Sequence, residues 1–187
     1  MSGHKHKQEN FKTLRKNKKL YNNCGLWTMD CGLKSMIEIF TDGSSRGNPG
    51  PGGYGTILRY KQHEKEITQG FRLTTNNRME LLAVIVGLEA IKTDNIPVMI
   101  YSDSKYVVDA VEKKWVYGWQ KKGFAGKANG DLWARFLRIY PKHQVKFTWI
   151  RGHAGHPENE RCDQLAVRSA LSPNLLIDHG YEALVQK

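Results

Sequence analysis

Four acidic side chains lie where a sheet protein could bring them together. Asp42 and Asp103 each follow a short apolar run of β-forming residues, while Glu80 and Asp163 lie near the starts of two helical patterns. Carboxylates at strand ends in an open α/β sheet can converge on one crevice. If they converge, they repel one another unless a cation lies among them. Clustered oxygen ligands suit Mg²⁺ or Mn²⁺ better than zinc.

Each of these features also has a simpler interpretation. A single Asp at a strand end is often a helix cap or a solvated turn residue, and spacing alone does not prove that the four carboxylates meet. His153, His156 and Cys162 could suggest zinc, but a fourth ligand is missing. The Gly-rich stretch 47–55 lacks the Gly-Lys-Ser/Thr ending of a phosphate-binding P-loop. We therefore favour a site for hard divalent cations.

Apolar periodicity predicts the elements that would position these side chains. The stretch 43–55 is rich in Gly and Pro and is predicted to be a tight loop. The segment 97–101 is continuously apolar, which is typical of a strand buried on both faces. The predicted strands are 37–41, 54–60, 66–73, 97–101 and 145–150, and the predicted helices are 77–92, 105–113, 132–140 and 158–171. This order predicts an α/β or α+β mixed sheet with an antiparallel hairpin at its edge.

Composition limits the class of protein. The chain has 187 residues, enough for one core of ordinary size, and 29 Lys and Arg against 18 acidic residues give a net charge of +11. A polyanion, most often nucleic acid, is the default partner of such a surface. No apolar run approaches the roughly 18 residues of a membrane span. The polar start and the three cysteines favour a cytoplasmic protein that has no membrane partner.

Two segments carry much of the positive charge. Residues 1–35 show neither strand nor helix periodicity, so we expect a basic, disordered extension or a misassigned start. Residues 113–127 interleave five lysines with aromatic residues. This basic segment is either a short helix whose Trp residues pack on the body, or a platform that places Lys on phosphates and rings against sugars; both can hold together. Its candidate contact residues are Trp115, Trp119, Lys121 and Lys122. Trp133 and Trp149 are predicted to be core aromatics.

The residues around the four carboxylates resemble the motifs of type 1 ribonuclease H. Thr41-Asp42-Gly43-Ser44, followed by 47–55, is similar to the first motif of that family, and 74–81 is similar to the second. Ser102-Asp103-Ser104 resembles the third motif and 152–163 the last. The similarity runs from Met36 to the C-terminus and is greatest to the bacterial branch with a basic protrusion, here 113–127. It implies a ribonuclease H catalytic domain over 36–187 with a five-stranded mixed sheet flanked by helices.

The resemblance also implies a mechanism and a substrate. Two Mg²⁺ ions, with Mn²⁺ as a possible substitute, would lie between the carboxylates and the RNA strand of an RNA–DNA hybrid. Asp42 would bridge both ions, Glu80 and Asp103 would hold one, and Asp163 would help to hold the other. An endonuclease of this kind leaves 5′-phosphate and 3′-hydroxyl ends, and His153 would assist product release or proton movement. Glu80 would also bond a 2′-hydroxyl, Asn48 would approach the minor groove, and Thr75, Asn76 and Asn77 are further candidate substrate-binding residues. The family is usually monomeric.

The sequence differs from the family motifs at two positions, and it allows two alternative functions. Ser45 stands where some bacterial relatives have Cys, and Lys105 stands where others have Gln, which leaves the fine substrate preference undetermined. A hybrid-binding module without catalysis is disfavoured because binding gains nothing from a cluster of negative charge beside phosphates. The ribonuclease H part of a larger polymerase is disfavoured by the length of the chain.

Overall fold

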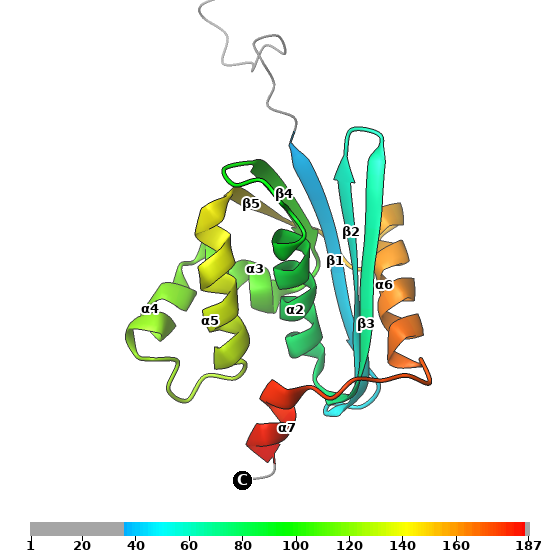
Figure 1. Cartoon of the computed structure of the whole chain (residues 1–187), viewed down its shortest axis with the longest axis vertical. Helices are drawn as coiled ribbons and strands as arrows, with labels where there is room; N and C mark the ends of the chain where they lie inside the picture. The colour runs from blue at the N-terminus through cyan, green and yellow to red at the C-terminus, as the bar shows by residue number, and fades with distance from the viewer. Residues whose placement is uncertain (1–35, 186–187) are drawn as a thin grey trace, which may run out of the picture. The chain divides into compact units, whose positions relative to one another are not determined.

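The computed structural model describes residues 36–185, which contain a five-stranded mixed sheet with the strand order β3-β2-β1-β4-β5 (Figure 1). The strands are β1 Ile37–Ser45, β2 Gly50–Tyr60, β3 His63–Thr74, β4 Pro97–Ser102 and β5 Gln144–Trp149. β1, β2 and β3 pair in antiparallel fashion, whereas β4 and β5 run parallel to β1. The predicted mixed sheet with an antiparallel hairpin edge is confirmed. The predicted extension 1–35 lies outside the described residues.

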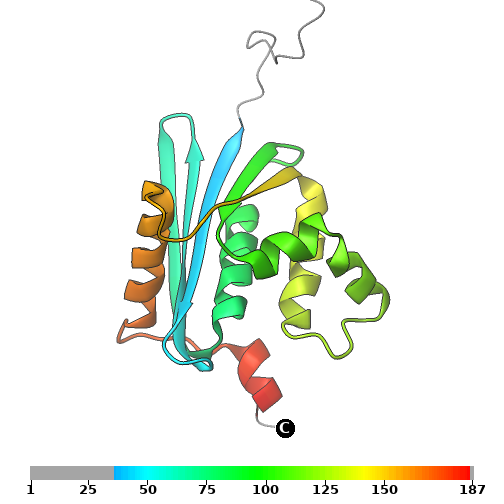
Figure 2. The same cartoon turned by 180° about the vertical axis from the view of Figure 1, so that it is seen from behind.

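Helices cover both faces of this sheet. They are α2 Asn76–Glu89, α3 Lys105–Glu112, α4 Trp115–Lys121, α5 Gly130–Ile139, α6 Pro157–Ala170 and α7 His179–Val185, with a 3₁₀ turn η1 at Tyr140–Lys142. Figures 1 and 2 show α2, α3 and α5 on one face and α6 on the other. No helix in the part of the chain that the structure describes is long and apolar enough to cross a membrane.

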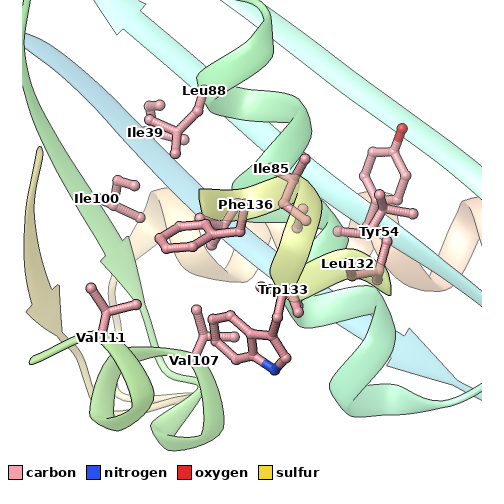
Figure 3. Packing of buried hydrophobic residues seen from close by; sticks show 14 of the residues in the cluster. Ile39, Tyr54, Ile85, Leu88, Ile100, Val107, Val111, Leu132, Trp133 and Phe136 are labelled. Carbon is pink, nitrogen blue, oxygen red and sulfur yellow. The ribbon is translucent and has the colours of Figure 1, made fainter. Parts of the chain in front are cut away.

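The main core lies between the sheet and the layer of α2, α3 and α5 (Figure 3). Because side chains alternate along a strand, Ile39 of β1 faces this core, while its neighbour Phe40 faces α6. Helix α2 lies between the sheet and α5, so nearly all of its residues are buried. Trp133 is fully buried, as predicted, and Cys162 packs with Phe40 in the smaller cluster under α6.

Two predictions about the strands are wrong, one on the bounds of a loop and one on burial. The stretch 43–55 is not one loop, because β1 continues to Ser45 and β2 begins at Gly50, which leaves only residues 46–49 as a turn. The segment 97–101 is not buried on both faces: its residues alternate between buried and half-buried. The physical reason is that α6 packs against β1, β2 and β3 but not closely against β4. The side chains of β4 on that face of the sheet are therefore only half-buried.

The segment after α6 returns along the outer edge of the sheet. The main chain of Leu176 donates to Gly70 and accepts from Arg72 of β3. Beyond it lies α7, a seven-residue helix that the periodicity did not predict. At the start of α2, buried Arg78 forms paired hydrogen bonds of 2.6–2.9 Å with Asp131 and with buried Asp178. These ion pairs join α2, α5 and the C-terminal segment.

Candidate active site

Three of the four predicted carboxylates converge. Asp42 lies in β1, Glu80 in the second turn of α2, and Asp103 directly after β4. Their carboxylate oxygens include three that all lie within 4.8 Å of one another. The fourth, Asp163, comes from α6 on the opposite face of the sheet and lies outside this group of three. We call Asp42, Glu80 and Asp103 the acidic triad.

A close approach between β1 and α2 brings Asp42 and Glu80 together. A Cβ atom at Gly43 would overlap the main-chain nitrogen of Glu80 and would lie 2.5 Å from the carbonyl carbon of Met79. Only glycine therefore lets the strand and the helix lie this near. The Gly43 amide also donates a 2.7 Å hydrogen bond to Asp42 Oδ1, which fixes the direction of that carboxylate.

Burial and mutual repulsion disfavour negative charge in the triad. Asp42 and Glu80 are 7% and 6% exposed. Burial, together with the charges of Asp103 and Asp163, raises the pKa of Asp42 to about 8. The pKa of Glu80 is raised well above its ordinary value by burial and by the charges of Asp42 and Asp103. Without a cation, these two carboxyl groups tend to take up protons instead.

The triad has the donor atoms that a divalent cation needs. Glu80 Oε2 and Asp103 Oδ1 are buried and have no hydrogen-bond partner among residues 36–185. Buried polar atoms are nearly always paired, so two orphaned carboxylate oxygens in one cluster indicate that a ligand belongs there. Hard oxygen donors of this kind match Mg²⁺ or Mn²⁺. The residues present therefore fit the metal predicted from the sequence.

Side-chain amides surround the triad. Asn76 Nδ2 donates to Glu80 Oε1 at 3.4 Å, and the main-chain N–H of Asn76 donates to Asn48 Oδ1 at 3.2 Å. Two predicted substrate contacts are thus tied to each other, while Thr75 is the residue that precedes α2 and Asn77 is exposed.

Buried Asn159 was missed by the sequence analysis. Its Nδ2 donates to Asp103 Oδ2 at 3.4 Å, and its own Oδ1 is buried without a partner. The available signal was its position one turn before Asp163 in the same helix, because residues four apart share a helix face.

His153 lies on the loop between β5 and α6 and is exposed. The loop passes close to the triad, since a Cβ at Gly152 would lie 2.5 Å from Asp103 Oδ2. Within residues 36–185 the His153 ring forms no hydrogen bond with any of the four acidic residues. The loop that carries His153 therefore lies beside Asp103, while the His153 ring is exposed to solvent.

The basic segment 113–127 contains both of the arrangements that the sequence allowed. Trp119 is half-buried and packs edge-on against Trp133, with ring centroids 5.6 Å apart. Trp115 is 47% exposed, with Lys113 Nζ 4.9 Å from its ring centre. Lys121 and Lys122 are exposed. One aromatic residue therefore anchors the segment, and another faces solvent among lysines.

Acidic side chains gathered at the ends of the central strands of a mixed five-stranded sheet place this chain in the ribonuclease H class of folds. The chain belongs to the ribonuclease H family: the RNase H family model matches residues 34–171. The predicted resemblance, fold and enzyme class are thereby confirmed.

Individual relatives agree with this assignment. The chain is 56% identical to a ribonuclease H of Desulforamulus reducens over 147 residues, which are 76% of this chain and 92% of the relative. Among solved structures it is similar to LC9-RNase H1, a type 1 RNase H with the type 2 active-site motif, with a TM-score of 0.67, 31% identity and 84% of each chain covered. It is also similar to LC11-RNase H1 in complex with an RNA/DNA hybrid, with a TM-score of 0.53, 27% identity, and 72% of this chain and 96% of that chain covered.

Proposed function

We propose that this protein is an endoribonuclease that hydrolyses the RNA strand of RNA–DNA hybrids and leaves 5′-phosphate and 3′-hydroxyl ends. The observation that carries the proposal is the acidic triad, whose two orphaned buried oxygens face a site for cations in a chain of the ribonuclease H family. The hybrid complex of a similar structure, LC11-RNase H1, supports the choice of substrate.

Two divalent ions, Mg²⁺ or in its place Mn²⁺, complete the proposed site. Asp42 would be shared by both ions, Glu80 and Asp103 would hold one, and Asp163 would help to hold the other. Bound ions of this kind activate a water and neutralise charge on the leaving oxygen. The protein orients the ligands: the Gly43 amide fixes Asp42, and Asn159 donates to Asp103.

Side chains around the triad would bind the hybrid. We propose that Asn48, Thr75, Asn76 and Asn77 contact its minor groove, because the Asn48–Asn76 bond holds the two segments that carry them together. Glu80 would accept a hydrogen bond from a 2′-hydroxyl, the group that distinguishes RNA from DNA. His153, on the exposed loop beside Asp103, would move a proton or assist product release.

One assay decides between catalysis and binding alone. A labelled RNA–DNA hybrid is incubated with the protein and Mg²⁺, beside single-stranded RNA, duplex RNA and duplex DNA. We expect cleavage of the RNA strand in the hybrid only, with 5′-phosphate ends on the products. Binding of the hybrid without cleavage in either Mg²⁺ or Mn²⁺ would show that the chain is a binding module.

The basic segment 113–127 would hold the DNA strand through Trp115, Trp119, Lys121 and Lys122. Replacing Lys121 and Lys122 with Glu should therefore raise KM and leave kcat largely intact, because only uniform binding is lost. Each lost phosphate contact should flatten the log–log salt dependence of binding by about one unit. Steady-state kinetics and binding titrations over a range of salt concentrations measure both effects.

A matched control separates this effect from net charge. Lys61 lies in the β2–β3 turn and Lys65 near the start of β3, at the opposite end of β1 from Asp42. Their replacement with Glu changes the net charge equally and should alter KM far less. If instead the Lys121/Lys122 variant loses kcat at saturating hybrid with its salt slope unchanged, the segment supports the triad directly.

Metal removal should make stability depend on pH. The pKa of Asp42 is about 8 in the folded protein against an ordinary value of 3.8, so the folded state without metal binds a proton more tightly than the unfolded state. That stabilisation is complete below the ordinary value and is lost as the pH rises towards 8. In EDTA, we expect the Tm to fall over this range.

Added ions should reverse this loss. At pH 8, Mg²⁺ or Mn²⁺ at about a hundred times its Kd should raise the Tm by roughly 5–10 °C, and by less at pH 5.5, where protons compete. The Asp42→Asn variant serves as the control, since its Tm in EDTA should vary less with pH. An ion-induced shift that is equal at both pH values and in this variant would place the binding elsewhere.

We further propose that residues 36–187 form the catalytic domain, and that residues 1–35 are a basic extension that adds affinity for nucleic acid through charge. The protein acts as a monomer. A single chain supplies the whole triad, so these three carboxylates need no second copy of the chain. It works in the cytoplasm, in keeping with the buried free thiol of Cys162.

A further inference from the structure

The end of β5 places an aromatic ring beside the triad. Trp149 was predicted to lie in the core, yet it is 44% exposed. It pairs with Ser102 across the β4–β5 ladder, so it lies next to the strand end that carries Asp103. Indole rings are mostly well buried, and exposed ones are typical of binding surfaces. The position of Trp149 therefore calls for a role at the site.

The indole of Trp149 holds the main chain of Asp103. Its Nε1 donates a 3.0 Å hydrogen bond to the Asp103 carbonyl oxygen. β4 ends at Ser102 and α3 begins at Lys105, so Asp103 lies in the short connection between two regular elements. The indole bond continues the attachment of β4 to β5 for one residue beyond the ladder.

The Asp103 side chain has little else to fix its direction. Within the described part of the chain, Oδ1 has no hydrogen-bond partner, and the one partner of Oδ2 is Asn159 at 3.4 Å. The direction of the carboxylate therefore depends on the main chain to which it is attached. Partners that orient a metal ligand in this way commonly change metal affinity when they are removed.

Lys105 lies over the same ring. Its Nζ is 5.0 Å from the centre of the Trp149 ring, and the side chain is exposed. Among the salt bridges of residues 36–185, none involves Lys105, so its ammonium is held by the ring instead of by a carboxylate. The ring thus holds the Lys105 ammonium group two residues along the chain from Asp103. A phosphate bound beside the triad would be attracted to this positive charge.

We propose that Trp149 is a positioning residue for Asp103, and that Lys105, held on the Trp149 ring, binds a backbone phosphate of the nucleic acid beside the triad. This inference rests on the proposed function of the triad. It assigns one task to the indole N–H and another to the ammonium group, so the two tasks can be separated by substitution.

Trp149→Phe keeps an aromatic ring under Lys105 and removes the N–H donor. Calorimetric titration of the metal-free protein with Mn²⁺ should show a Kd raised by roughly 10-fold. The KM for hybrid at saturating ion should be unchanged. A Tm that falls while the Kd for Mn²⁺ stays at the wild-type value would show a merely structural role and would overturn the assignment.

Lys105→Gln removes the cation and keeps the indole bond. We expect a higher KM for hybrid and a salt slope flattened by about one unit, with the Kd for Mn²⁺ unchanged. Lys65→Gln, an equal loss of charge near the start of β3, is the control and should show neither effect. Trp149→Ala should combine both defects, because it also removes the ring that holds Lys105. An unchanged KM and slope in Lys105→Gln would refute the phosphate contact.

The titration also separates this inference from the proposed function. If the wild-type protein binds Mn²⁺ but cleaves no hybrid, the proposed function is wrong, and the Kd of Trp149→Phe still tests the role of the indole. If the wild-type protein cleaves hybrid and Trp149→Phe binds Mn²⁺ normally, the function stands and the positioning role is wrong.

Discussion

Asp42→Asn is expected to abolish hybrid cleavage while leaving hybrid binding intact. Asp42 is the ligand proposed to be shared by both ions, and metal ions contribute several kcal/mol of transition-state stabilisation. Losing that contribution corresponds to a fall in kcat of roughly a thousandfold or more. Binding should survive because the variant removes a negative charge from a surface that meets phosphates. Single-turnover cleavage and a binding titration on the same hybrid measure both quantities.

The same variant should be more stable than the wild-type protein when metal is absent. At pH above about 8, the buried Asp42 carboxylate is ionised beside Asp103 and Asp163, and Asn removes that repulsion. The Tm in EDTA at pH 8.5 should therefore rise, although activity is lost. Near-normal turnover by Asp42→Asn would refute the metal assignment, whereas a lower Tm would show that the hydrogen bond from the Gly43 amide to Asp42 outweighs the repulsion between the carboxylates.

Asp178→Asn is expected to cause the largest loss of stability. Arg78 is 2% exposed and forms ion pairs with Asp131 and Asp178, of which Asp178 is itself buried. Asp178→Asn leaves the Arg78 guanidinium with Asp131, which is 42% exposed, as its remaining charged partner. Breaking a buried ion pair in this way costs about 3 kcal/mol. For a domain of this size, that corresponds to a Tm lower by roughly 6–12 °C. Urea denaturation followed by fluorescence gives the free energy of unfolding.

An exposed pair in the same region provides the control. Arg135 of α5 donates from Nε and Nη2 to Glu89 of α2 at 2.7 and 2.6 Å, and the two side chains are 37% and 36% exposed. Arg135→Gln should therefore cost less than about 1 kcal/mol. Equal losses in the two variants would mean that the C-terminal segment is held by its main chain and apolar contacts instead of by Arg78.

The triad could be predicted from the sequence because its positions follow from local rules. Asp42 and Asp103 directly follow apolar runs, and parallel strands end at the same edge of a sheet, so local pattern predicts that they could share one crevice. That β1 and β4 are neighbours in the sheet was not given by local pattern. To place Glu80, the start of a helix also had to be predicted, and the run of Thr and Asn before it supplied that signal. The family motifs added residue-by-residue roles that the spacing did not supply.

Contacts between distant segments could not be predicted in this way. Asn159 is 56 residues from Asp103, and Asp178 is 100 residues from Arg78, so no local pattern links them. Trp149 was misplaced because apolar character does not show which face of an edge strand is covered. The stretch 43–55 was misplaced because composition cannot separate a glycine in a turn, such as Gly47, from one that permits close packing, such as Gly43.

The dispersal of the four carboxylates has a consequence for the newly made protein. Asp42, Glu80, Asp103 and Asp163 come from four elements, and α6, which supplies the last, packs on the opposite sheet face from α2. Synthesis runs from the N-terminus, so α6 leaves the ribosome after all five strands. A nascent chain therefore cannot bring Asp163 towards the acidic triad until α6 has docked, and the proposed site of four carboxylates is completed only after the last strand, β5.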